Sequence, residues 1–305
     1  MIAYHYCSLN AFLSIIRNKQ FYLSDPLKMN DSSEITWYLN KLKEEWREFR
    51  SYEIPFTFLN HEIEYEPEVN VGSLFDMLKS RLGIPNLSIE DLKKHIKNKG
   101  QNSIFIGSFS KEPDILSQWR AYADDGKGVS IGFDLDYLQK ADNIFAQEVF
   151  YTDGVVYKEA DHDIENLGFE VCTLYNENKI DSEDERIQLL LHELIPVVAK
   201  YKNPAFREEN EVRLIYCEDP KFDKLLDRYN AFQEKYKFTH LEHDFRICNT
   251  SNNIIEFIKL DFDINVIKEI YIGPKCLATK DDIIKIIKKF KGHNVDVINS
   301  KASYR

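Results

Sequence analysis

The sequence predicts an α+β fold in which residues 1–305 form a single domain, with helical insertions at about residues 31–100 and 160–203. Short β-branched and aromatic segments are scattered among amphipathic helical segments, without the regular strand and helix alternation of a doubly wound sheet. Hydrophobic residues make up 43% of the chain, and 20 Phe and 17 Tyr supply apolar surface that offsets the entropy lost on folding. We therefore expect a folded globular protein with a sizeable core.

The first residues predict a compact strand, helix and strand unit. Residues 2–6, "IAYHY", read as a short strand, and Ser8 is the expected N-cap of a helix whose apolar residues recur at helical spacing. The strand "FYLSDP" follows and ends at Pro26, since proline cannot continue a ladder. The next segment, "NDSSEITWYLNKLKEEWREFR", predicts a helix capped by Asp31 or Ser32.

The middle of the chain predicts further strands separated by helices. Residues 102–110, "NSIFIGSFS", read as a strand. A short helix and a Gly-bearing turn at residues 125–128 follow, and they lead to a strand at residues 129–133. "AQEVFYT" is a further expected strand. Residues 183–202 predict a long amphipathic helix that leads into the strand "NEVRLIYC".

The last third begins with a predicted helix at residues 222–238, "FDKLLDRYNAFQEKYKF". The ending then alternates strands with one helix, in the order "IIEFIKLDF", "IKEIYIGP", "KDDIIKIIKKFKG" and "VDVINS".

Charge and cysteine usage restrict the surroundings in which we expect the chain to act. The formal net charge of -11 opposes non-specific binding to nucleic-acid backbones and to anionic lipid, although "KKFKGH" is locally basic. The five cysteines lie far apart without a CxxC pair, which favours a reducing compartment. No stretch approaches the ~18 apolar residues of a membrane span, so we expect a soluble, cytoplasmic protein without a membrane partner.

The stretch "FREENEVRLIY" raises the main chemical question. If it is a strand, Glu209, Glu211 and Arg213 share one face, while Val212 and Leu214 pack inward from the other. One interpretation is a solvated face on which Arg213 pairs with a glutamate, worth roughly 0.2 to 1 kcal/mol. The other is a carboxylate that binds a sugar hydroxyl and stabilises positive charge developing at the anomeric carbon.

Three patches resemble a bacterial family known as domain of unknown function 2971. They are "YHYCSLNAFLSIIRNKQFYLSDPLKMNDSSE", "SFSKEPDILSQWRAYADDGKGVSIGFD" and "FREENEVRLI", and the late segment "IKEIYIGPK" is similar to the closing segment of that family. Together these patches touch nearly the whole length of the chain. The resemblance implies membership of the family and leaves the activity open.

A more distant resemblance is to the ADP-ribosyltransferases. His5 in "AYHYCS" matches their first-strand histidine, Tyr22 or Ser24 in "FYLS" the middle element, and Glu211 in "ENEVR" the catalytic glutamate, with Glu209 in the first place of the Glu-x-Glu pair. The resemblance implies a split β-sheet core and an NAD site. Glu211 would bind a ribose hydroxyl in the transition state, and His5 would donate hydrogen bonds to the adenosine-side ribose.

The same resemblance implies the reaction and its participants. NAD would be the substrate of an ADP-ribosyltransferase, or of an NAD glycohydrolase if water is the acceptor, in a bacterial toxin or antiphage system. The acceptor, a protein or a nucleic acid, stays open, as does an antitoxin or phage protein as partner.

Secondary contacts with the dinucleotide are expected from aromatic and basic side chains. Tyr22, Trp119 or Tyr122 would stack on the nicotinamide or adenine ring, although Trp119 and Tyr122 also have the spacing of a helical packing pair. Arg120 and Lys127 would neutralise the pyrophosphate near the Gly-bearing turn.

Two other functions stay open. A module of the same shape could sense a nucleotide or a phage protein without turnover. A magnesium-dependent nuclease could draw on the acidic residues Asp134, Asp136, Glu209 and Glu211, since paired acids hold magnesium.

Motifs for other metal sites are incomplete, and we expect none. "HELIP" has Pro196 where a zinc-protease helix that begins at His192 needs its second ligand. His240 and His243 form a His-x-x-His pair without a third ligand in view.

Overall fold

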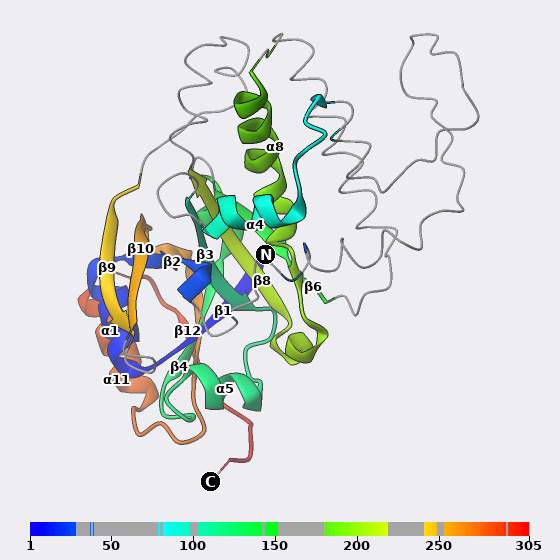
Figure 1. Cartoon of the computed structure of the whole chain (residues 1–305). Coiled ribbons are helices and arrows are strands. Elements are labelled where there is room, and N and C mark those ends of the chain that lie inside the picture. The colour runs from blue at the N-terminus through cyan, green and yellow to red at the C-terminus, as the bar shows by residue number, and fades with distance from the viewer. Residues whose placement is uncertain are drawn as a thin grey trace, which may run out of the picture.

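The computed structural model describes residues 1–28, 37, 39, 79, 82–97, 103–141, 144–151, 180, 182–218, 241–248, 253–290 and 292–304 (Figure 1). Within them it shows a mixed α+β architecture, which confirms the predicted class. The helix predicted at residues 222–238 lies outside this part of the chain, as does most of the helix at residues 30–50.

A ten-stranded mixed sheet forms the centre of the molecule. Eight strands run in the order β12-β11-β4-β1-β3-β2-β10-β9, and β8 pairs with β3 and with β5. All pairs are antiparallel except β11 with β12. The strands are β1 (Ile2–Cys7), β2 (Gln20–Ser24), β3 (Ser103–Ser110), β4 (Val129–Asp134), β5 (Ile144–Glu148), β8 (Glu211–Glu218), β9 (His243–Cys248), β10 (Asn253–Asp261), β11 (Ile267–Ile272) and β12 (Asp296–Asn299).

The sheet branches at β3. Along one edge β3 pairs with β8 over its whole length. Along the other edge it meets β1 only at the Tyr4–Ser110 pair and β2 only at the Ser24–Ile106 pair. The strands β1 and β2 are therefore neighbours of β3 without being paired to each other. This divergence leaves room for a cavity beside β3.

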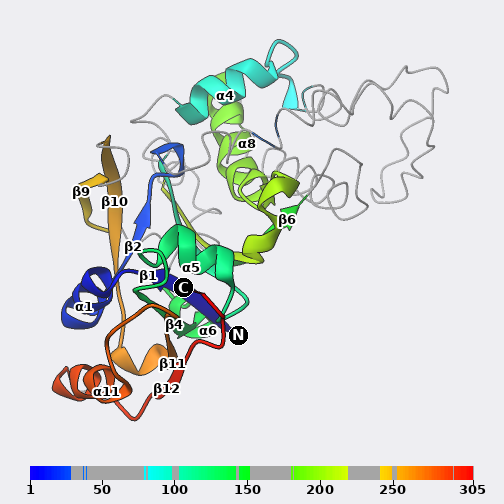
Figure 2. The same ribbon diagram turned by 90° about the horizontal axis from the view of Figure 1, so that it is seen from below.

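The described helices are α1 (Leu9–Asn18), α4 (Ile89–Lys97), α5 (Leu116–Tyr122), α6 (Leu135–Leu138), α8 (Glu183–Val198) and α11 (Lys280–Lys289). Short 3-10 turns occur at η1 (Pro26–Lys28), η2 (Pro204–Glu209) and η3 (Ile264–Val266). Figure 2 shows α1 and α11 close together on one side of the sheet. Among the described residues, no helix is long and apolar enough to cross a lipid bilayer.

Alternation along β1 separates the two faces that it contributes to the core. Ala3 and Cys7 belong to the main core, which α1 and α11 also enter, whereas Tyr4 and Tyr6 pack with Trp119 of α5 on the opposite face. The predicted opening unit is confirmed, because the Ser8 hydroxyl accepts from the Ala11 amide at 3.2 Å and caps α1.

Several predicted boundaries are wrong for identifiable reasons. The expected strand "AQEVFYT" is divided into β5 and a short β6 (Phe150–Tyr151), which pairs with β7 (Tyr201–Lys202) in a second sheet. Because β7 follows at once, helix α8 ends at Val198 and does not continue to residue 202. The strand "NEVRLIYC" begins one residue late, since Asn210 takes a left-handed conformation with φ of 43°. Strand β9 was not predicted.

Candidate functional site

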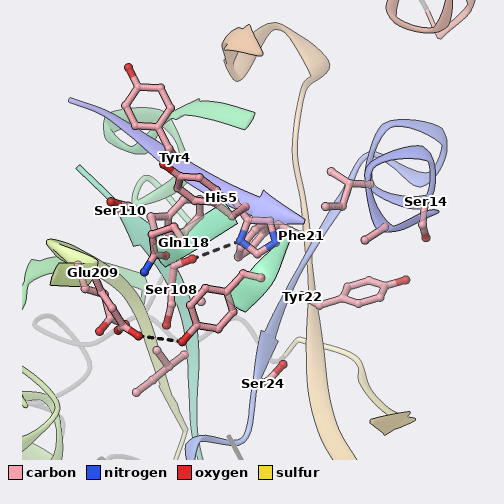
Figure 3. Close-up of a pocket in the computed structure, with 18 of the residues that line it drawn as sticks. Tyr4, His5, Ser14, Phe21, Tyr22, Ser24, Ser108, Ser110, Gln118 and Glu209 are labelled. Carbon is pink, nitrogen blue, oxygen red and sulfur yellow. Dashed lines mark hydrogen bonds between the residues drawn. The ribbon is translucent and has the colours of Figure 1, made fainter. Parts of the chain in front are cut away.

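A cavity of about 440 Å³ lies where β1 and β2 diverge beside β3 (Figure 3). Its volume is within the range of roughly 300–1,000 Å³ that is usual for small-molecule sites. Strands β1, β2 and β3 form one part of its wall, and α1, α5, the end of β7, η2, the start of β8 and one residue of β9 complete it.

The cavity brings together most of the side chains that the sequence singled out. These are His5, Tyr22, Ser24, Tyr122, Glu209 and Glu211, which come from β1, β2, α5, η2 and β8. The imidazole from the start of the chain and the carboxylates from its last third therefore face a common hollow.

Trp119, Arg120 and Lys127 do not line this cavity. Trp119 is 0% exposed, and its indole nitrogen donates to the Asp114 carboxylate at 2.6 Å, so it is a core residue that cannot stack on a ligand. Arg120 lies near the Tyr304 ring, with its guanidinium carbon 5.8 Å from the ring centroid. The burial of Trp119 corrects its expected stacking. Phosphate binding by Arg120 and Lys127 stays a prediction, away from this cavity.

His5 stands half-buried in the cavity wall. Its Nδ1 lies 3.2 Å from the carbonyl oxygen of Ser108, and its ring meets the edge of Phe21 at a centroid distance of 4.9 Å. Desolvation lowers the pKa of His5 to about 4, an effect that the Ser108 carbonyl opposes and the Arg246 charge reinforces. Neutral His5 must donate its Nδ1 proton to the carbonyl, which leaves Nε2 as a hydrogen-bond acceptor.

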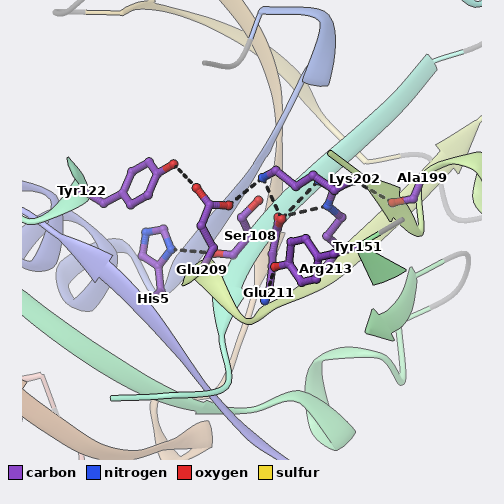
Figure 4. A network of polar contacts seen from close by, with 9 residues as sticks. All are labelled: His5, Ser108, Tyr122, Tyr151, Ala199, Lys202, Glu209, Glu211 and Arg213. Atoms are coloured by element: carbon purple, nitrogen blue, oxygen red, sulfur yellow. Dashed lines mark hydrogen bonds and ion pairs between the residues drawn. The ribbon is translucent and has the colours of Figure 1, made fainter. Parts of the chain in front are cut away.

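A network of charges closes the other end of the cavity (Figure 4). The Lys202 ammonium lies 2.7 Å from Glu209 and 2.9 Å from Glu211. Arg213 donates to the two Glu211 oxygens at 3.0 and 3.2 Å, and to the Ala199 carbonyl at 2.6 Å. Two carboxylates are thus matched by two cations within one contiguous set of contacts.

Burial distinguishes the two carboxylates. The Glu211 side chain is 2% exposed and the Arg213 side chain 0% exposed, whereas the Glu209 side chain is 15% exposed. Burial favours the neutral Glu211 carboxyl, but the charges of Arg213 and Lys202 outweigh it and lower the pKa of Glu211 to about 2. Glu211 is therefore a buried, ionised anchor.

The two glutamates reach the cavity by different routes. The expectation that Glu209, Glu211 and Arg213 share one strand face is therefore corrected. Glu209 belongs to η2, which Asn203 caps by accepting from the Ala205 amide at 2.9 Å. The left-handed Asn210 then turns the chain, so that β8 starts at Glu211. Because Glu211 and Arg213 pair inside the protein, their contact is not a surface ion pair.

Glu209 faces the open side of the network. One of its oxygens accepts from the Tyr122 hydroxyl at 2.8 Å and the other contacts Lys202. Tyr122 is 38% exposed, so this hydrogen bond lies at the edge of the cavity. Glu209 is the carboxylate that a ligand can approach most directly.

Sequence reasoning missed Lys202, Phe206 and Arg246, which also line the cavity. Lys202 fell inside a predicted helix, although it occupies β7. Phe206 lies in η2, with the Lys202 ammonium 4.9 Å from its ring centroid. For Arg246, the alternation of polar and apolar residues in "HDFRIC" was a usable strand signal.

Acidic residues proposed for a magnesium nuclease do not come together at this site. Asp134 and Asp136 contact the N-terminal amino group and do not line the cavity that holds Glu209 and Glu211. Within the described ranges, no three His, Cys, Asp or Glu side chains form a group suited to a metal ion.

The other metal motifs add no further group. His243 pairs with Glu218 at 2.6 Å and with Glu256 at 2.9 Å, while His240 and the side chain of His192 lie outside the described part. Pro196 stands inside α8.

Part of the chain matches the model of one family. Residues 118–214 match the model of a family described as "Protein of unknown function (DUF2971)". No match was found among curated proteins or among solved structures. The matched range contains Tyr122, Lys202 and both cavity glutamates, whereas His5 lies outside it. These comparisons show no relationship to ADP-ribosyltransferases, so that resemblance stays a prediction.

Proposed function

We propose that the chain consumes NAD, either as an ADP-ribosyltransferase or, with water as acceptor, as an NAD glycohydrolase. The observation that carries this proposal is the single cavity shared by His5, Tyr22, Ser24 and the two glutamates, in the chain order that the resemblance implies. The branched sheet around β3 supports an ADP-ribosyltransferase-like core. The resemblance further suggests a toxin or antiphage role.

The carboxylate end of the cavity suits the chemistry of nicotinamide release. When the bond between the ribose carbon and the nicotinamide nitrogen breaks, the electron pair leaves with nicotinamide and positive charge builds on the sugar. An ionised carboxylate in a partly desolvated wall stabilises that charge more strongly than water does. The acceptor hydroxyl or water then forms the new bond to the ribose carbon and releases its proton.

Glu209 and Glu211 have different roles in this proposal. Glu209 contacts the ribose, since a sugar hydroxyl can take the place of the Tyr122 hydroxyl on its outer oxygen. Glu211 is a positioning residue, because both its oxygens already accept hydrogen bonds from Arg213 or Lys202. It holds Lys202, which in turn contacts the inner oxygen of Glu209.

His5 contributes as a neutral group from β1. With Nδ1 committed to the Ser108 carbonyl, Nε2 accepts a hydrogen bond from a ligand hydroxyl. This reverses the direction expected from the resemblance, in which His5 donates to the ribose. A neutral imidazole also avoids repelling the positively charged nicotinamide ring.

A second function, nucleotide sensing without turnover, is favoured by one observation. Every oxygen of the two glutamates already has a partner in Tyr122, Lys202 or Arg213, so a bound sugar must displace one of them. If that exchange does not occur, the cavity binds a nucleotide and performs no chemistry.

Nicotinamide release from NAD by the purified full chain tests the proposal. Glu209→Gln keeps the size of the side chain and removes its charge, and we expect it to slow release by roughly 10² to 10⁴-fold. Glu208→Gln is the matched control, because Glu208 is an exposed neighbour in η2 that does not line the cavity. Urea denaturation establishes that both variants are folded.

The possible outcomes separate the two functions. If the wild type and Glu209→Gln released nicotinamide from NAD at the same rate, the catalytic role assigned to Glu209 would be contradicted. An absence of release, together with a melting temperature raised by NAD or ADP-ribose, would favour sensing, because a ligand that binds only the folded state raises its stability.

A further inference from the structure

Arg246 reaches the cavity from β9, the last strand on its side of the sheet. Its side chain extends across β10 toward β2, where Nη2 donates to the Ser24 hydroxyl at 2.9 Å. The guanidinium carbon lies 5.9 Å from the centroid of the Phe257 ring, and that ring packs on Tyr22 at 4.4 Å. Contacts with β2 and β10 therefore fix the guanidinium at the cavity wall.

A cation stands at each end of the cavity. At the η2 end, the Lys202 cation is shared between Glu209 and Glu211. At the β2 end, Arg246 lies beside the hydroxyl of Ser24 and near neutral His5. Since the Ser24 oxygen accepts from Arg246, the hydroxyl proton of Ser24 can be donated to a ligand. This end therefore offers a cation and a hydroxyl donor to an anion.

We propose that Arg246 and Ser24 form a phosphate-binding subsite, which selects phosphorylated nucleotides over their unphosphorylated counterparts. A guanidinium presents parallel N–H donors that match two phosphate oxygens, and its charge strengthens both hydrogen bonds. The inference rests on the proposed function in taking a nucleotide as the ligand. It adds that the phosphates point toward β2 and β9, with the ribose next to nicotinamide toward Glu209.

Lys259 provides a matched control on the same face of the sheet. It pairs in register with Tyr22, and its ammonium contacts Asp244 at 2.8 Å and Glu242 at 3.6 Å. Lys259 does not line the cavity. Its replacement removes one positive charge from the same face of the sheet and leaves the proposed subsite intact.

Binding of ADP-ribose to the full chain, measured by calorimetry, tests the subsite without requiring turnover. We expect Arg246→Gln to raise the Kd for ADP-ribose roughly 10- to 100-fold, as charge-assisted hydrogen bonds are lost. Arg246→Lys should lose less affinity for ADP-ribose, because lysine keeps the positive charge but lacks the parallel N–H donors of the guanidinium. The Kd of Lys259→Gln for ADP-ribose should stay within about 2-fold of the wild-type value. Inorganic pyrophosphate should raise the melting temperature of the wild type and not that of Arg246→Gln.

Failure of the subsite differs from failure of the proposed function. The subsite would be overturned if folded Arg246→Gln bound ADP-ribose with a Kd within about 2-fold of the wild-type value. It would also be overturned if the wild type did not bind ADP-ribose. Arg246-dependent binding without nicotinamide release from NAD would support the subsite and contradict the enzyme. If Arg246→Gln released nicotinamide from NAD with an unchanged KM, this result would overturn the subsite and support the proposed enzymatic function.

Discussion

Replacing Glu211 by Gln should show how much the buried charge network contributes to the free energy of unfolding. The variant keeps the shape of the side chain but removes the carboxylate charge that contacts the fully buried Arg213, while Lys202 retains Glu209. Removing one member of a buried ion pair costs about 3 to 5 kcal/mol, because the remaining charge stays desolvated. We therefore expect Glu211→Gln to lower the free energy of unfolding by about 3 kcal/mol or more near neutral pH.

The pKa of Glu211 gives an independent estimate and predicts the pH dependence. It falls from 4.5 to about 2 on folding, which corresponds to about 3 kcal/mol of stabilisation. Because the folded carboxyl has the lower pKa, the unfolded chain binds the proton first as the pH falls. The stabilisation is complete above about pH 4.5 and is lost progressively toward pH 2. Glu211→Gln cannot titrate, so its deficit relative to wild type should shrink over that range.

Urea denaturation between pH 3 and pH 7, followed by the fluorescence of the three tryptophans, measures this difference. The double variant Glu211→Gln, Arg213→Met removes both charges and should recover most of the loss, because no buried charge is then left unpaired. A deficit below about 1 kcal/mol at neutral pH, or one that stays constant down to pH 3, would refute the reasoning.

Two further predictions concern the cavity wall. The His5 imidazole should titrate with a pKa of about 4 in the folded protein. Because the unfolded chain takes up this proton near pH 6.5 and the folded protein does so only near pH 4, the free energy of unfolding should decrease as the pH falls from 6.5 toward 4. An NMR titration midpoint near 6.5 would contradict this. Gly107→Ala should destabilise the protein by about 1 to 3 kcal/mol in urea denaturation, because its new Cβ would lie 2.4 Å from Phe21 and 2.5 Å from Leu23; unchanged stability would show that β2 can move away from β3.

Local signals predicted the elements that depend on nearby residues. The hydroxyl cap at Ser8 and the helical spacing after it identify α1, and the strands on either side follow from their composition. The meeting of His5 with Glu211 in one cavity was expected only through a family resemblance. Nothing in their local sequence specifies a contact between residues about two hundred positions apart.

The remaining features of the site depend on backbone geometry that composition does not specify. Asn210 takes a left-handed conformation, which takes Glu209 out of the strand and places it in η2. Lys202 continues an amphipathic pattern that predicts a helix, yet the pairing of β7 with β6 removes it from α8. Strand β9 was not predicted, although "HDFRIC" partly alternates polar and apolar residues, and the approach of Arg246 to Ser24 required the folded sheet.

A crystal structure of the chain with ADP-ribose tests the central claim most directly. We expect the ligand to occupy the cavity between β1 and β2, with phosphate oxygens on Arg246 and Ser24 and a ribose hydroxyl on Glu209 in place of Tyr122. Ligand density elsewhere on the protein, with the contact between Tyr122 and Glu209 intact, would contradict the account.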